Sequence, residues 1–63
     1  MRIDRVKLIS FMTMQNVKQY ELSNSAGVSL STVNSICCGR SCREETAKKI
    51  ASALGVELKE IVE

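Results

Sequence analysis

Apolar and polar residues follow the spacing of α-helices along the chain, and three glycines divide that pattern. The segment between Gly39 and Gly55 is the most regular, with apolar residues at i, i+3, i+4 and i+7. These residues are Ala47, Ile50, Ala51 and Leu54. Ser41 lies three residues before Glu44, which predicts a capping box at the start of this helix. Gly55 is placed to end it in the left-handed conformation.

The two ends of the chain also have helical spacing. Residues 2–15 contain no breaker, and Leu8, Phe11 and Met12 share one face of the predicted helix. The other apolar residues of this segment point elsewhere, so some apolar surface is left for solvent or a partner: Ile3, Val6 and Met14. After Gly55, the spacing of the last apolar residues predicts a final helix of about one and a half turns.

The middle of the chain predicts two short helices joined by a tight turn. Residues 19–25 form the first, the Ala26-Gly27-Val28 stretch interrupts it, and Ser29 is placed to cap the second. Gly27 is expected to take a positive φ, which a side chain would oppose. The residues expected to fix the angle between the two helices are Leu22, Ala26, Val28, Val33 and Ile36. A helical corner of this kind is used for docking in the DNA major groove.

The stretch from Gln19 to Ile36 resembles the helix-turn-helix of Cro/CI-type (lambda-repressor-like) DNA-binding domains. The matching residues extend beyond that stretch: Gln19, Ala26-Gly27-Val28-Ser29, Thr32-Val33, Ile36, Gly39-Arg40, Glu45-Thr46, Lys49 to Val56, Leu58 and Ile61. The resemblance implies one all-α domain over residues 1–63, a compact globule of five helices with its helix-turn-helix core at 19–38. Lys18 replaces the usual Ser or Thr cap, Ser23 replaces a common Ala, and Cys37-Cys38 replaces Glu-Asn.

In this geometry the second helix of the motif lies in the major groove and the first crosses the DNA backbone. The resemblance marks Leu30, Ser31 and Ser35 as base readers and Gln19 as a DNA contact. Serine, threonine and asparagine can hydrogen-bond to base edges, and a leucine can pack on a thymine methyl group. The expected DNA-contacting residues are Lys18, Gln19, Ser29, Leu30, Ser31, Thr32, Asn34, Ser35, Arg40 and Arg43.

Charge along the chain agrees with an anionic partner at one end. Residues 1–49 carry eight basic and four acidic side chains (+4), whereas residues 50–63 carry one basic and three acidic (−2). Lys18, Arg40 and Arg43 are the predicted phosphate anchors. If each acts in both subunits of a dimer, log K should fall against log salt with a slope of roughly −4 to −6.

A dimer is expected because the chain has more apolar side chains than so small a core can cover. Two-fold pairing would place the two reading helices about 34 Å apart, on an operator with inverted half-sites. Relatives commonly pair through their last helix, and the first helix is the competing surface. The candidate dimer or partner residues are Val56, Leu58, Ile61, Val62, Ile3 and Val6.

Composition argues against an enzyme. The chain has no His, which removes the commonest general base and the commonest metal ligand. Cys37, Cys38 and Cys42 are too few for a tetrahedral zinc site without a fourth ligand, so we expect no metal, no cofactor and reduced thiols, with a redox role as the alternative. No apolar run is long enough to span a membrane. We expect a cytoplasmic, nucleoid-associated protein of a prokaryote, phage or mobile element.

The sequence therefore predicts a DNA-binding transcriptional regulator, with a repressor that blocks polymerase as the first reading. The alternative is an antitoxin-like protein or other interaction module whose main role is to bind a protein partner through an apolar helix.

Overall fold

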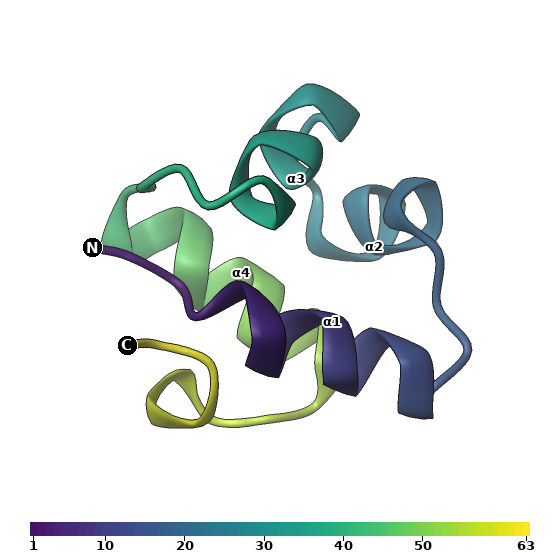
Figure 1. The fold of residues 1–63 in the computed structure, drawn as a ribbon. Coiled ribbons are helices and arrows are strands. Elements are labelled where there is room, and N and C mark those ends of the chain that lie inside the picture. Colours follow the sequence, from purple (N-terminus) through teal and green to yellow (C-terminus); the bar gives the residue numbers. More distant parts are fainter.

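A computed structural model describes all residues, 1–63, and consists of four α-helices followed by a single 3-10 turn. The helices are α1 (Arg5–Met14), α2 (Gln19–Ala26), α3 (Leu30–Cys37) and α4 (Glu44–Leu54), and the turn is η1 (Leu58–Glu60). In Figure 1, α3 lies at one end of the molecule, α1 and η1 lie at the other, and α4 passes between them. None of the helices has the length and apolar character needed to cross a membrane.

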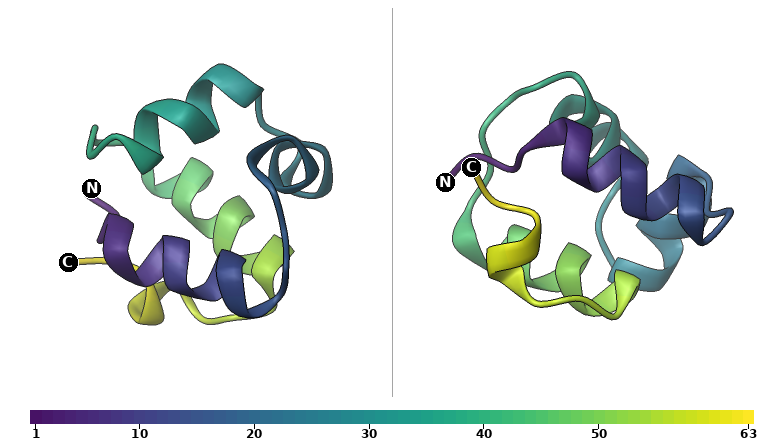
Figure 2. Two further views of the ribbon diagram at one scale, coloured as in Figure 1. Left: turned by 45° about the vertical axis from the view of Figure 1, so that its right-hand side comes forward. Right: turned by 60° about the horizontal axis from the view of Figure 1, so that its bottom comes forward.

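The all-α class is confirmed, whereas the fifth helix is wrong. The last predicted helix is reduced to three residues, because Ile61 turns inward and is buried, and residues 62–63 then run beside the amino-terminal segment. Ile3 and Val62 form an isolated antiparallel bridge, in which the Asp4 amide donates to the Ile61 carbonyl at 2.7 Å. Both views in Figure 2 show the two chain ends beside each other.

The first helix is shorter than residues 2–15. It begins at Arg5 because the Asp4 carboxylate accepts hydrogen bonds from the amides of Val6 and Lys7, an N-cap that holds the preceding residues in extended form. It ends at Met14, and Asn16 takes a left-handed conformation with φ 55°. Asparagine tolerates this conformation better than most residues, so Asn16 takes the place that glycine often has after the end of a helix.

The start of α4 also differs from the prediction. The helix begins at Glu44 with Arg43 as its N-cap residue, and no side chain caps it. The capping box of Ser41 and Glu44 is therefore wrong: Ser41 lies in the loop, and the Glu44 carboxylate instead pairs with Lys48 at 3.0 Å. The predicted end is confirmed, since Gly55 has φ 71° and ψ 27°.

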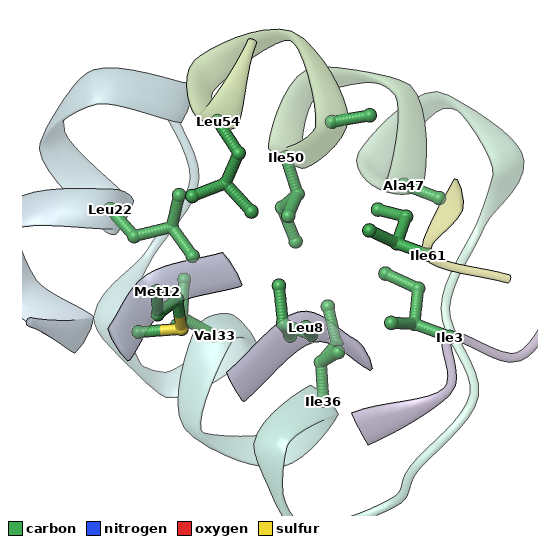
Figure 3. Close-up of a cluster of buried hydrophobic side chains, with 11 residues drawn as sticks. Ile3, Leu8, Met12, Leu22, Val33, Ile36, Ala47, Ile50, Leu54 and Ile61 are labelled. Atoms are coloured by element: carbon green, nitrogen blue, oxygen red, sulfur yellow. The ribbon is translucent and has the colours of Figure 1, made fainter. Parts of the chain in front are cut away.

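The core joins all four helices and both chain ends. The apolar stripe of α4 faces α1 and α3 across this core (Figure 3). Its eleven buried apolar residues are Ile3, Leu8, Met12, Leu22, Val33, Ile36, Ala47, Ile50, Ala51, Leu54 and Ile61. No buried side-chain polar atom lacks a hydrogen-bond partner. The rest of the molecule therefore holds α2 and α3 in a fixed position.

Candidate nucleic-acid interface

The turn between α2 and α3 has the geometry that the sequence predicts. Gly27 ends α2 with φ 72° and ψ 30°, and its amide donates to the Ser23 carbonyl. Leu22 and Val33 are buried on the facing sides of the two helices, so apolar packing fixes the corner. The Ser23 hydroxyl, in place of the common alanine, donates to the Tyr20 carbonyl at 2.8 Å and is thereby satisfied.

The two helices of the motif begin differently, and only α3 has a side-chain N-cap. At α3, the Ser29 hydroxyl oxygen accepts a hydrogen bond from the Thr32 amide at 3.1 Å, and the two hydroxyls lie 2.8 Å apart. The predicted Ser29 cap is confirmed, and these two side chains hold the first turn together. At α2, Lys18 cannot cap through its side chain, and the Glu21 carboxylate instead accepts from the Lys18 amide at 3.0 Å.

The outward face of α3 carries side chains that have no partner within the protein. Ser31 and Asn34 are exposed, Ser35 is half-buried, and none of the three makes a side-chain hydrogen bond. Leu30 is 50% exposed although it is a large apolar residue. These hydroxyl and amide groups are thus free to bind a ligand, and Leu30 adds an apolar surface beside them.

This face continues into a shallow depression that runs along α3 from its first turn. The depression has a volume of about 490 Å³ and is bordered by α3, the following loop and the start of α4. It is lined by Ser31, Thr32, Ser35, Ile36, Arg40, Ser41, Cys42, Arg43 and Thr46. Hydroxyls and guanidinium groups dominate this list, and it contains no carboxylate, so the depression suits an anion or a hydrogen-bonding ligand.

The carboxylates of the chain are all engaged within the molecule. Three of the seven accept hydrogen bonds from backbone amides at helix or turn starts: Asp4, Glu21 and Glu60. The other four form ion pairs: Glu44 with Lys48, Glu45 with Lys49, Glu57 with Lys59, and Glu63 with Arg2. None of the seven carboxylate side chains lines the depression beside α3.

The basic side chains differ from the carboxylates, because only some of them have a partner within the protein. Four of the nine Lys and Arg side chains take part in those ion pairs, which leaves five without a carboxylate partner. These five are Arg5, Lys7, Lys18, Arg40 and Arg43. All three predicted phosphate anchors are among them. Lys18 and the half-buried Gln19 lie at the start of α2, whereas Arg40 and Arg43 lie beyond the end of α3, so unpaired cations occur next to both helices of the motif.

The residues predicted to form a dimer or partner interface do not form a single exposed surface. Ile3 and Ile61 are only 2% and 0% exposed, so their assignment to an interface is wrong, because the bridge between the chain ends draws both into the core. Val6 is 69% exposed on α1, and the remaining three are half-buried near the carboxyl terminus: Val56, Leu58 and Val62.

Further apolar exposure lies on α1, where Ile9 is 44% and Met14 is 74% exposed. Val6 points away from Leu8 and Met12 on α1, and Ile9 and Met14 lie on either side of Val6 around the helix axis.

The cysteines are free thiols beside the end of α3. Cys38 is exposed, whereas Cys37 and Cys42 are half-buried. Burial, and secondarily the neighbouring Cys38, raises the pKa of the Cys37 thiol; burial also raises the pKa of Cys42, against a smaller opposing effect of the amino terminus. Both half-buried thiols are protonated at neutral pH, which makes them poor nucleophiles. No group of three or more potential ligands gathers as a metal site.

Two residues near the motif were not singled out by the sequence. Tyr20 is 54% exposed in the first turn of α2, directly after Gln19, so its position alone was a usable signal. Arg5 lies beside Gly39 at the end of α3. The two residues are far apart in the sequence, so only the tertiary structure shows that they are close in space.

The geometry agrees with the comparison to known families. A helix-turn-helix family model matches residues 8–61, so the chain belongs to the Cro/CI-type helix-turn-helix family. This membership indicates a DNA-binding transcription regulator. No match was found among curated proteins or among solved structures.

Proposed function

We propose that the protein is a sequence-specific transcriptional repressor that binds an inverted-repeat operator as a homodimer, with α3 in the major groove. The observation that carries this proposal is the unpartnered polar face of α3, beside Arg40 and Arg43, two cations that have no carboxylate partner. Phosphate contacts by these cations position the motif, and contacts from α3 select the sequence.

Within α3, the proposed base contacts differ in chemistry. Asn34 can bind adenine through two hydrogen bonds, which discriminates by about 1–3 kcal/mol against another base. Leu30 packs on a thymine methyl group, an apolar contact that accounts for a half-exposed leucine at the helix start. Ser31 and Ser35 line the depression beside Arg40 and supply adaptable hydroxyls.

A small number of phosphate contacts gives only modest affinity for DNA, and dimerisation raises that affinity because two subunits bind together. Three anchors in each of two subunits give six contacts, which corresponds to a salt slope of about −5. The outer face of α1 is the proposed pairing surface, because Val6 and Met14 expose apolar side chains there and Ile9 adds to them. Sedimentation of the free protein as a monomer at every concentration would remove the dimer from this proposal.

The test begins with selection of bound fragments from a random duplex pool. Enrichment of a motif with two inverted half-sites is the expected result, and its absence counts against sequence-specific binding by a dimer. The Ser31→Ala/Ser35→Ala variant should then lose affinity for the selected duplex. Ser25→Ala/Ser52→Ala is the matched control, since these two serines line a separate depression between α2 and α4.

The exposed apolar face of α1 also favours a second candidate, an antitoxin-like or other protein-interaction module. The two functions separate on paired variants. Val6→Lys/Met14→Lys should abolish capture of a protein partner in the second case, whereas a repressor with these changes loses dimerisation and retains half-site contacts. Ile3 is unsuitable for this test because a polar residue at a core position would unfold the domain.

A further inference from the structure

Arg5 is a cation held at the end of the reading helix without a partner of its own. It is the first residue of α1, 34 residues before Gly39 in the sequence. A Cβ placed on Gly39 would lie 3.9 Å from Arg5 Cδ and 4.0 Å from Nη1, so the arginine side chain lies near Gly39, where α3 has ended. In both views of Figure 2 the start of α1 and the loop after α3 lie on the same side of the molecule.

Arg5 lines a depression together with Asp4, Gly39 and Glu63, and the acceptors of these three residues bind other donors. The Gly39 carbonyl accepts a hydrogen bond from Arg2 Nη2 at 2.9 Å, and Arg2 Nε lies 3.7 Å from a Glu63 carboxylate oxygen. The neighbouring carboxylate, Asp4, accepts from the first amides of α1. Arg5 itself makes no hydrogen bond or ion pair, so its guanidinium donors remain available to an external acceptor.

The position of Arg5 extends the free positive charge that begins at α4. Arg43 and Arg40 border the depression beside α3, and Arg5 lies near Gly39, the residue directly before Arg40. Gly39 is one residue from Arg40, so the proposed ligand of Arg5 is a phosphate next to the one that Arg40 binds. Arginine suits this role because its fork of donors can bind a phosphate through two hydrogen bonds.

We propose that Arg5 is a phosphate-binding residue, which extends the DNA footprint from the helix-turn-helix to the amino-terminal end of α1. This proposal rests on the proposed function, because it requires α3 to dock on a duplex. It adds one backbone contact per subunit on the side of Arg40 and Arg43, and it predicts no change in base preference.

The experiment measures the affinity of the full chain for the selected duplex and for a mixed-sequence duplex of equal length by fluorescence anisotropy, over a series of KCl concentrations. Arg5→Gln should make the slope of log K against log salt less steep by about 0.9 per subunit, equivalent to about eightfold weaker binding per contact at 0.1 M salt. The loss should be similar on both duplexes, and Arg5→Lys should retain most of the slope, since a point charge also neutralises a phosphate.

Lys7→Gln is the matched control. Lys7 is also unpaired and exposed. It is two residues after Arg5 in α1, so the two side chains point about 200° apart around the helix axis. An Arg5→Gln slope equal to that of the wild type, or equal to that of Lys7→Gln, overturns the proposal. A lower melting temperature with an unchanged slope would instead assign Arg5 to support of the α3 terminus. A wild-type chain that binds neither duplex refutes the proposed function itself, whereas wild-type binding with no Arg5 effect refutes only this contact.

Discussion

Substitution of Gly27 by alanine tests the turn on which the proposed DNA-binding geometry depends. Gly27 has φ 72° and ψ 30°, and Gly55, at the end of α4, has φ 71° and ψ 27°. A Cβ added at either position would meet no atom within 4 Å. The cost of the substitution is therefore conformational and free of steric clash, and both sites share it.

The left-handed conformation costs an L-residue about 1–2 kcal/mol. Alanine also restricts the unfolded chain, which recovers about 0.4–1 kcal/mol, so the expected net loss of unfolding free energy is about 1 kcal/mol. In a domain of this size such a loss lowers the melting temperature by about 4–8 °C. Gly27→Asn should lose less, because asparagine tolerates this region better.

The assay is urea unfolding followed by circular dichroism, with Gly55→Ala as the matched control. The two alanine variants should agree to within about 0.5 kcal/mol, because their backbone angles and surroundings agree. A Gly27→Ala protein as stable as the wild type would refute the positive φ at the turn. A loss more than about 2 kcal/mol larger than that of Gly55→Ala would mean that the helix corner itself rearranges, and the conformational argument would fail.

Other predictions concern the cap, the reading face and the thiols. Ser29→Ala should cost about 1 kcal/mol in urea unfolding, because the Thr32 amide loses its acceptor, and an unchanged midpoint would contradict the cap. Leu30→Ala should leave stability within about 0.5 kcal/mol of the wild type, since the side chain is half exposed. It should weaken operator binding, and replacing the contacted thymine by uracil should weaken wild-type binding and leave the variant unaffected. Burial raises the pKa of Cys37 and of Cys42 in the folded chain, so the unfolded thiols ionise first as pH rises. Their contribution to stability is complete below the unfolded pKa and is lost as pH rises through the folded pKa. The melting temperature should fall above about pH 9, less steeply in Cys37→Ala, and a decline identical in this variant would count against the assignment.

Much of the fold was predictable because local signals agreed with the packing. The stripe of α4 and the left-handed glycines follow from spacing and from backbone preference alone. The hydroxyl of Ser29 was correctly predicted to cap α3. Family resemblance over Gln19 to Ile36 predicted the same corner that the core holds in place.

The errors arose where distant segments compete with local preference. Ser41 and Glu44 have the spacing of a capping box, but the Cys42 amide donates to the Met1 carbonyl at 2.9 Å, and the loop continues as far as Arg43 before α4 begins. Ile61 belongs to a helical pattern in sequence, yet its burial against the amino-terminal segment ends the helix after one turn. Neither contact can be read from residues that lie next to each other in the chain.

The same limit applies to the candidate site. Exposed α3 residues could be chosen from helical periodicity, since Val33 and Ile36 define the inward side. The distribution of ion pairs could not be predicted, because it depends on which carboxylates accept hydrogen bonds from backbone amides and which pair with a cation. The sequence indicates an excess of positive charge in its first 49 residues, and only the structure shows which cations remain unpaired.

The meeting of the two termini makes the polypeptide almost a closed ring. The Glu63 amide donates to the Arg2 carbonyl at 3.2 Å, and each end contributes an isoleucine to the interior. Most domains fray harmlessly at their ends, but here detachment of either end exposes an interior side chain. A short peptide linker between residues 63 and 1 would seal that seam, and new ends opened within the exposed stretch 40–41 would give a circular permutant that retains every helix.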